Sequence, residues 1–109
     1  MALTVDYRET VAERIKKDPE FARALLAEAA TLLVNGEAEA ARLLMRDLTH
    51  GLVGFEGLAK ETGRPSKSLH RMLAAGGNPG MDALASIFKA LTGAMLHGKS
   101  AVVKIAEAA

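Results

Sequence analysis

Apolar residues recur every three to four positions through most of this chain, which is the period of an α-helix with one buried face. This period predicts six helices, over residues 6–17, 19–34, 37–49, 55–62, 66–74 and 81–91, with residue 65 or 66 opening the fifth. The predicted apolar stripes are Val11 and Ile15, then Phe21, Leu25, Ala29, Leu32 and Leu33, then Ala40, Ala41, Leu44 and Leu48, and last Leu84, Ile87, Phe88 and Leu91.

Residues that favour helix ends separate these stretches. Asp18 is a strong N-cap before Pro19 at the first helical position of the second helix. Asn-Gly at 35–36 and His-Gly at 50–51 are predicted to close the second and third helices. Gly-Gly-Asn-Pro-Gly at 76–80 is a break between the fifth and sixth helices, and the sixth is expected to end before Gly93.

The helical pattern fades after Gly93, where residues 101–103, Ala-Val-Val, form a candidate short strand. The length of 109 residues favours a single domain, residues 1–109. Within it we expect N-terminal helices over 1–51, a helical core over 52–93 and a short tail over 94–109. The predicted fold class is an all-α helix-turn-helix bundle of five to six helices.

Composition supports a globular helical protein. Half of the residues are hydrophobic, a quarter are charged, and Ala and Leu dominate the apolar set. The absence of Cys excludes disulfide bonds and thiolate chemistry. No apolar run approaches the ~20 residues of a transmembrane helix, and no signal peptide is visible. We therefore expect a cytoplasmic protein without a membrane partner.

Charge is divided unevenly along a chain whose net charge is only +1. Residues 1–53 carry seven Lys or Arg and nine Asp or Glu, a net charge of −2, whereas residues 54–109 carry seven and four, a net charge of +3. The local excess is greatest over residues 60–71, where four basic residues accompany only Glu61. Such a patch suits an anionic partner, although an ordinary solvated helix face has the same composition.

Residues 55–74, FEGLAKETGRPSKSLHRMLA, have the layout of a helix-turn-helix. Ala59 is small, as the crossing of two helices requires, and Gly63 follows four residues later with access to a left-handed turn. The predicted inward residues of the second helix are Leu69, Met72 and Leu73. Its remaining face is short, polar and basic, which is the composition of a helix that enters the major groove of DNA.

Each residue of the outer face has an expected role in DNA binding. Lys67 and Arg71 are four apart on one face, and either can donate to guanine O6 and N7. Lys60 and Arg64 flank the motif and are expected to contact phosphates. The other predicted DNA-binding residues are Ser66, Ser68 and His70. The alternative is an ordinary helical hairpin in a protein-interaction module, with an incidental basic patch.

No other chemistry is indicated by the sequence. His50, His70 and His97 are far apart and lack partners at metal-ligand spacing, so we expect no metal site. No Ser-His-Asp grouping or nucleotide-binding glycine loop is present, and residues 76–80 lack the Lys-Ser/Thr ending of a phosphate loop. We therefore expect neither enzymatic activity nor a cofactor.

Residues 54–93 together resemble a known family, the HigA-like antidote proteins of bacterial addiction modules, which belong to the Xre/Cro class of helix-turn-helix regulators. The resemblance lies in Leu-Ala at 58–59, Thr-Gly at 62–63, Ser-Leu-His-Arg at 68–71, Gly-Asn-Pro at 77–79 and Lys-Ala-Leu at 89–91. This chain has His70 where an aromatic residue is commoner, Thr-Gly at 92–93 in place of a simple Gly, and longer N-terminal helices than the short antidotes.

The resemblance implies a cytoplasmic homodimer that binds double-stranded operator DNA, binds a small toxin protein and represses its own operon. Two surfaces are candidates for the dimer contact. One is the last helix and tail, with Phe88, Leu91, Met95, Val102 and Val103. The other is the extra N-terminal helix pair, with Leu26, Leu33 and Val34 off the main stripe. The first is favoured because it adjoins the DNA-reading motif and would hold the two reading helices at a fixed spacing.

Overall fold

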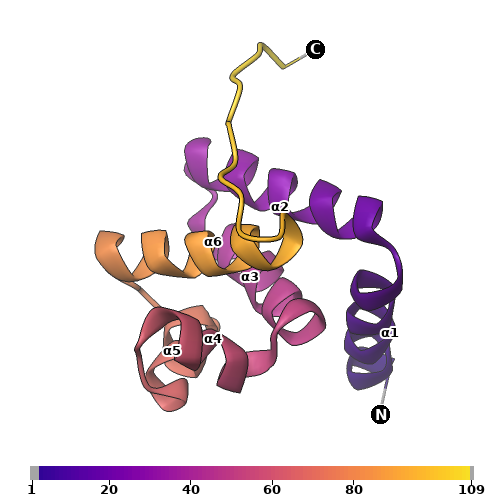
Figure 1. Ribbon diagram of the computed structural model, residues 1–109, viewed down its shortest axis with the longest axis vertical. Helices are drawn as coiled ribbons and strands as arrows, with labels where there is room; N and C mark the ends of the chain where they lie inside the picture. Colours follow the sequence, from indigo (N-terminus) through magenta and orange to yellow (C-terminus); the bar gives the residue numbers. More distant parts are fainter. Residues whose placement is uncertain (1–2, 109) are drawn as a thin grey trace.

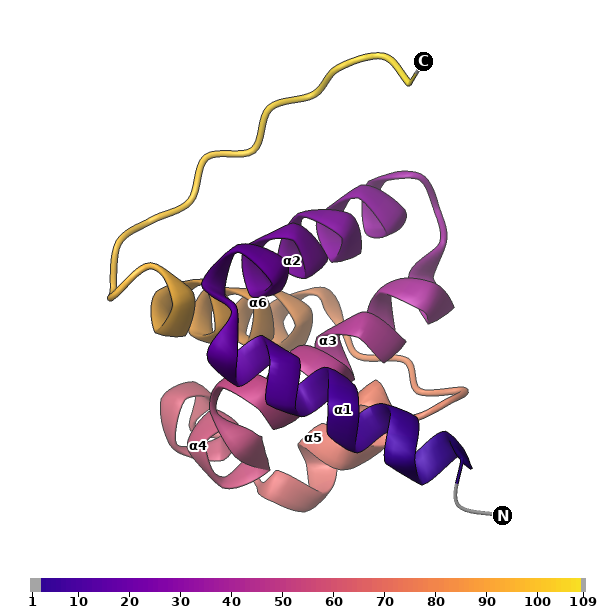
Figure 2. The same cartoon turned by 90° about the vertical axis from the view of Figure 1, so that its right-hand side faces the viewer.

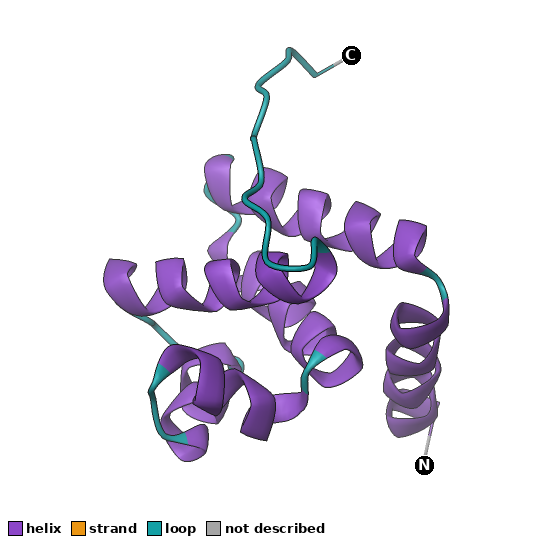
Figure 3. Cartoon of the chain, in the orientation of Figure 1, coloured by secondary structure: helices purple, strands orange, loops and turns teal. Residues whose placement is uncertain are grey.

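Six α-helices form the described part of the chain, residues 3–108 of the computed structural model, with side chains described from residue 10 onward (Figures 1 and 3). They are α1 (Leu3–Lys17), α2 (Pro19–Val34), α3 (Ala38–Leu52), α4 (Gly54–Thr62), α5 (Ser66–Leu73) and α6 (Met81–Met95). The all-α prediction is confirmed, while residues 1, 2 and 109 of the predicted domain lie outside the described part. Within residues 3–108 no helix is long and apolar enough to cross a membrane.

The core is built around α3, which packs against each of the other five helices. Met45 and Leu48 of α3 are completely buried, together with Leu58, Ile87 and Leu91 from α4 and α6. Met45 was absent from the predicted stripe, whereas the predicted Ala40 and Leu44 are only partly buried. Five neighbouring helices bury more of α3 than the single stripe that periodicity identifies.

The predicted stripe of the second helix is confirmed in part, because Phe21, Leu25 and Ala29 lie in or against the core whereas Leu32 and Leu33 are only partly buried. Ala22 and Ala29 are its buried residues, and Phe21 and Leu25 pack against the core from partly buried positions. The small side chains face inward because α2 lies close to α3 and α1. Large apolar residues of α2 are thereby left at the edge of the core, where Val34 is exposed.

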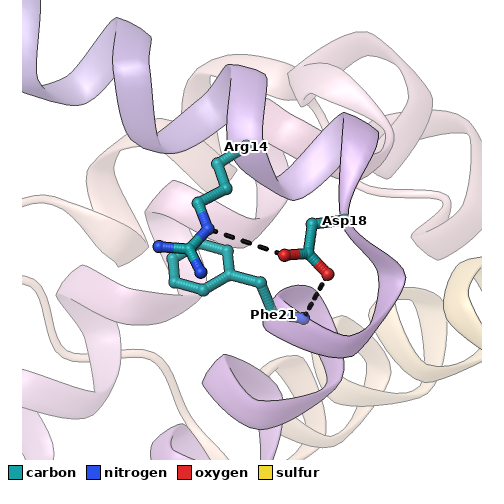
Figure 4. A network of polar contacts seen from close by, with 3 residues as sticks. All are labelled: Arg14, Asp18 and Phe21. Atoms are coloured by element: carbon teal, nitrogen blue, oxygen red, sulfur yellow. Dashed lines mark hydrogen bonds and ion pairs between the residues drawn. The ribbon is translucent and has the colours of Figure 1, made fainter.

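The corner between α1 and α2 is held by a capped helix start (Figure 4). The Oδ1 of Asp18 accepts a hydrogen bond from the N–H of Phe21 at 3.1 Å, which confirms the predicted N-cap. The guanidinium of Arg14 lies 4.0 Å from the ring centroid of Phe21, and its Nε is 3.6 Å from Oδ2 of Asp18. Because the ion pair is largely exposed, the cap and the packing of Phe21 against the core stabilise this corner more than the charges do.

Two predicted helix ends are wrong, and packing explains both. The third helix continues through Gly51 to Leu52, and the left-handed residue is Gly54, at φ +72°. Gly51 is instead a point of close approach, because a Cβ there would lie 2.5 Å from Cγ2 of Ile15 in α1. The sixth helix likewise continues through Gly93 to Met95, whose side chain packs against the core.

The predicted strand at residues 101–103 is also wrong. The chain leaves α6 through a turn at Gly98, with φ +84°, and then runs extended over residues 99–108 (Figure 2). Among the described residues none is in a β-strand, because this segment has no neighbouring strand with which to pair.

Gly51→Ala should lower the free energy of unfolding by about 1–3 kcal/mol, because the added methyl must displace the Ile15 side chain in a packed core. The matched control is Gly93→Ala, which adds the same methyl to a helix where nothing lies within 4 Å. The control should raise stability by up to about 1 kcal/mol through helix propensity. Urea denaturation measures both, and equal effects would contradict the close approach of α1 and α3.

Candidate nucleic-acid interface

The turn between α4 and α5 has the predicted geometry. Gly63 is left-handed at φ +70° and ψ 20°, and its N–H donates to the carbonyl of Ala59 at 2.9 Å. The Thr62 hydroxyl donates to the Leu58 carbonyl at 2.8 Å and accepts from the N–H of Arg64 at 3.3 Å. These bonds satisfy groups that the end of α4 would leave unpaired, so the chain reverses and α5 begins at Ser66.

The inner face of α5 is locked into the core. Leu69 and Leu73 are completely buried, as is Leu58 of α4, and Met72 packs against the same cluster from a partly buried position. All three predicted inward residues are therefore placed as expected. Burying two leucines on one side of an eight-residue helix fixes which residues it presents to solvent.

The outer face carries three exposed residues in a row, Lys67, His70 and Arg71. Lys60 is also exposed, on the helix before the turn, while Ser66, Ser68 and Arg64 are partly buried. All seven predicted residues thus lie on α4, α5 or the turn that joins them. This pair of helices lies at one end of the molecule, away from the tail (Figures 1 and 2).

Two of these residues are tied to their neighbours by hydrogen bonds. The Nε of Arg64 donates to Oγ of Ser86 in α6 at 3.3 Å, and that hydroxyl donates to the carbonyl of Ala83 at 2.8 Å. Arg64 therefore links the turn to α6 through one of its five N–H donors. The Nη2 of Arg71 lies 3.5 Å from Oγ of Ser68, at the long limit of a hydrogen bond.

The ring of His70 is engaged inside the motif. It stacks on the ring of Phe55, at the start of α4, with centroids 3.7 Å apart and an interplanar angle of 16°. His50, in the last turn of α3, also meets Phe55 in an edge-on arrangement, with centroids 5.2 Å apart. The sequence prediction assigned His70 to DNA alone, because no local spacing rule links residues fifteen positions apart.

The start of α5 also presents backbone donors. The first α5 amide with a helical acceptor is that of Leu69, which donates to the Pro65 carbonyl at 3.1 Å, and no side chain caps the helix. The preceding amides at 66–68 therefore point out of the helix start, beside Arg64 and Lys67. An amide cluster of this kind, together with adjacent cations, favours an anionic oxygen such as that of a phosphate.

A second surface lies away from the motif, between α2, the end of α6 and the tail. It is a groove of about 880 Å³ whose apolar walls are Leu26, Leu33 and Val34 on one side and Phe88 and Met95 on the other. The two predicted dimer surfaces are therefore the two walls of a single groove. Leu91, which was predicted to belong to one of them, is completely buried in the core and contributes no surface.

Comparison with protein-family models, curated proteins and solved structures finds no match to this chain. Among the described residues no group of three or more His, Asp or Glu side chains is placed to hold a metal ion. The features of the structure that bear on function are therefore the arrangement of α4 and α5 and the groove between α2, α6 and the tail.

His70→Ala should lower the free energy of unfolding by about 0.5–1.5 kcal/mol, the contribution of an aromatic pair, whereas His70→Phe should retain stability because it preserves the stack on Phe55. Thermal unfolding of the two variants and the wild type measures the difference. Equal melting temperatures for His70→Ala and wild type would show that the stack does not hold α5 against α4.

Proposed function

We propose that this protein is a sequence-specific DNA-binding transcriptional regulator that reads the major groove with α5. The observation that carries the proposal is the division of α5 into a completely buried face, Leu69 and Leu73, and an exposed basic face, Lys67 and Arg71. A short helix held on a rigid core, with cations along its outer side, matches the width and the charge of the groove.

The proposed contacts divide into reading and positioning. Arg71 and Lys67 reach base edges, and the Ser68 hydroxyl directs Arg71 rather than reading a base by itself. Lys60, Arg64 and the amides at the start of α5 hold phosphates on either side of the groove. Ser66 lies beside those amides and adds a hydroxyl donor. His70 faces DNA with its ring edge, because the ring face is stacked on Phe55.

A homodimer is part of this proposal. One recognition helix contacts only a few base pairs, so regulators of this kind gain specificity from two half-sites about 34 Å apart.

The further proposal of an antitoxin is supported by the resemblance of residues 54–93 to HigA-like antidote proteins. On this proposal the protein is cytoplasmic, is not an enzyme, binds a small toxin and represses its own operon. A small reading frame beside the gene should arrest growth when expressed alone, and co-expression of this protein should relieve the arrest. An adjacent frame without effect on growth would favour a free-standing regulator.

The groove between α2, α6 and the tail favours a second candidate function, a helical protein-interaction module. Its apolar walls and the exposed apolar residues of the tail are the kind of surface that binds another polypeptide. Dependence of binding on salt separates the two functions. Affinity for duplex DNA falls steeply with salt when phosphates are neutralised, whereas contact through an apolar groove is much less sensitive.

Replacement of Lys67 or Arg71 by Ala should each weaken binding to a site selected from a random duplex pool by about 1–3 kcal/mol, with relaxed preference at one base position. Both side chains are exposed, so thermal stability should stay at the wild-type value. Fluorescence anisotropy over a range of salt concentrations measures the affinity and its salt slope.

The matched control for that experiment is Lys16→Ala. Lys16 is an exposed cation on α1, which packs against α2 and α3 but not against α4 or α5 and does not line the groove between α2, α6 and the tail. The control removes the same charge and should leave both affinity and base preference nearly unchanged. A loss of affinity equal to that of Arg71→Ala would indicate attraction by overall charge. It would contradict the placement of α5 in the major groove of DNA.

A further inference from the structure

The tail has the properties of a β-strand that lacks a partner. Residues 99–108 belong to no helix or strand and follow an open course away from the helices (Figure 2), and Val102, Val103 and Ile105 are 84%, 68% and 85% exposed. Within the described chain, the N–H of Lys99 donates to Leu96, but no hydrogen bond involves the backbone from residue 100 onward. β-branched residues in an extended segment with both edges open favour pairing with another strand.

We propose that this partner is the tail of a second copy, paired antiparallel with Val103 opposite Val103. In this register Lys99 lies opposite Glu107 of the second copy at both ends of the ribbon, and Ala101 lies opposite Ile105. On the face that carries Val103, the opposite charges at the ends and the apolar residues at the centre are favourable cross-strand pairs, while on the other face Val102 lies opposite Lys104. The inference rests on the homodimer of the proposed function and names the contact that forms it.

Other registers lose this complementarity. Moving the centre one residue toward the C-terminus places Lys104 opposite Lys104, and a parallel ribbon places Lys99 opposite Lys99. Like charges directly opposite one another are destabilising. Only the arrangement centred on Val103 joins Lys99 to Glu107, the one acidic residue of the tail.

The groove between α2, α6 and the tail supplies an apolar surface on which the two paired tails can pack. Two isolated strands are marginally stable in water and need an apolar surface to pack against. The tail itself forms one side of the groove, and Phe88, Met95 and Leu26 line the sides formed by the helices. A second tail that pairs with the first can therefore pack against α2 and α6. Because this end of the molecule lies away from α5, the ribbon leaves the recognition helix free (Figure 2).

Single-cysteine variants of the full chain test the register, because the native protein has no cysteine. In Val103→Cys the two thiols lie directly opposite each other, within the reach of a disulfide. In the control Val102→Cys they lie diagonally, roughly 7–8 Å apart, which is too far. Oxidation with diamide should give a covalent dimer for Val103→Cys and much less for Val102→Cys. Equal yields, or no dimer from Val103→Cys, would overturn the proposal.

Charge reversal in the full chain provides an independent arm. Lys99→Glu and Glu107→Lys should each raise the dissociation constant of the dimer severalfold in analytical ultracentrifugation, and the double variant should return it close to wild type. Unchanged dimerisation in all three variants, or a wild type that stays monomeric, would contradict tail pairing. Either result would indicate that the groove between α2, α6 and the tail binds another protein. These measurements contain no DNA, so a failure here is distinct from a failure of the α5 variants to affect DNA binding.

Discussion

The rest of the structure depends on the burial of α3, because among the helices of residues 3–108 it alone touches all five others. Met45 and Leu48 are completely buried at its centre, and Gly51 lets α1 approach its last turn. The hydrophobic contacts made there set the positions of α4 and α5 relative to the N-terminal helices. The N-terminal helices therefore form part of one core with the helix-turn-helix, rather than an appended extension.

That core determines what α5 presents to solvent. Because Leu69 and Leu73 are held inside, the helix cannot rotate without exposing apolar surface, and Lys67 and Arg71 stay outward. The stack of His70 on Phe55 adds a contact at the outer edge of the helix pair, and the bond from Arg64 to Ser86 ties the turn to α6. On the proposed function, a helix fixed in this way loses little conformational freedom when it binds DNA.

The proposed DNA surface and the groove lie toward opposite ends of the molecule, which allows two binding events at once (Figures 1 and 2). α2 turns its small residues, Ala22 and Ala29, toward α3 and leaves Val34 in the open. Together with the unpaired tail, this makes an apolar surface that does not compete with α5. On our proposals, self-association through the tails and binding of DNA reinforce each other, since joining two copies raises the effective concentration of the second recognition helix.

The sequence alone determined the helical class, the capped start at Asp18, the left-handed turn at Gly63 and the inward set of α5, because each depends on residues close together in the chain. Tertiary packing decided the remaining features, since each joins segments that are distant in sequence. Gly51 does not end its helix but lies inside it, where it allows the close approach of Ile15. The sixth helix continues past Gly93 because Met95 packs against the core. Likewise, the ring of Phe55 stacks on that of His70, and the tail has no neighbouring strand with which to pair. Two apolar stretches that are separate in the sequence form the walls of one groove.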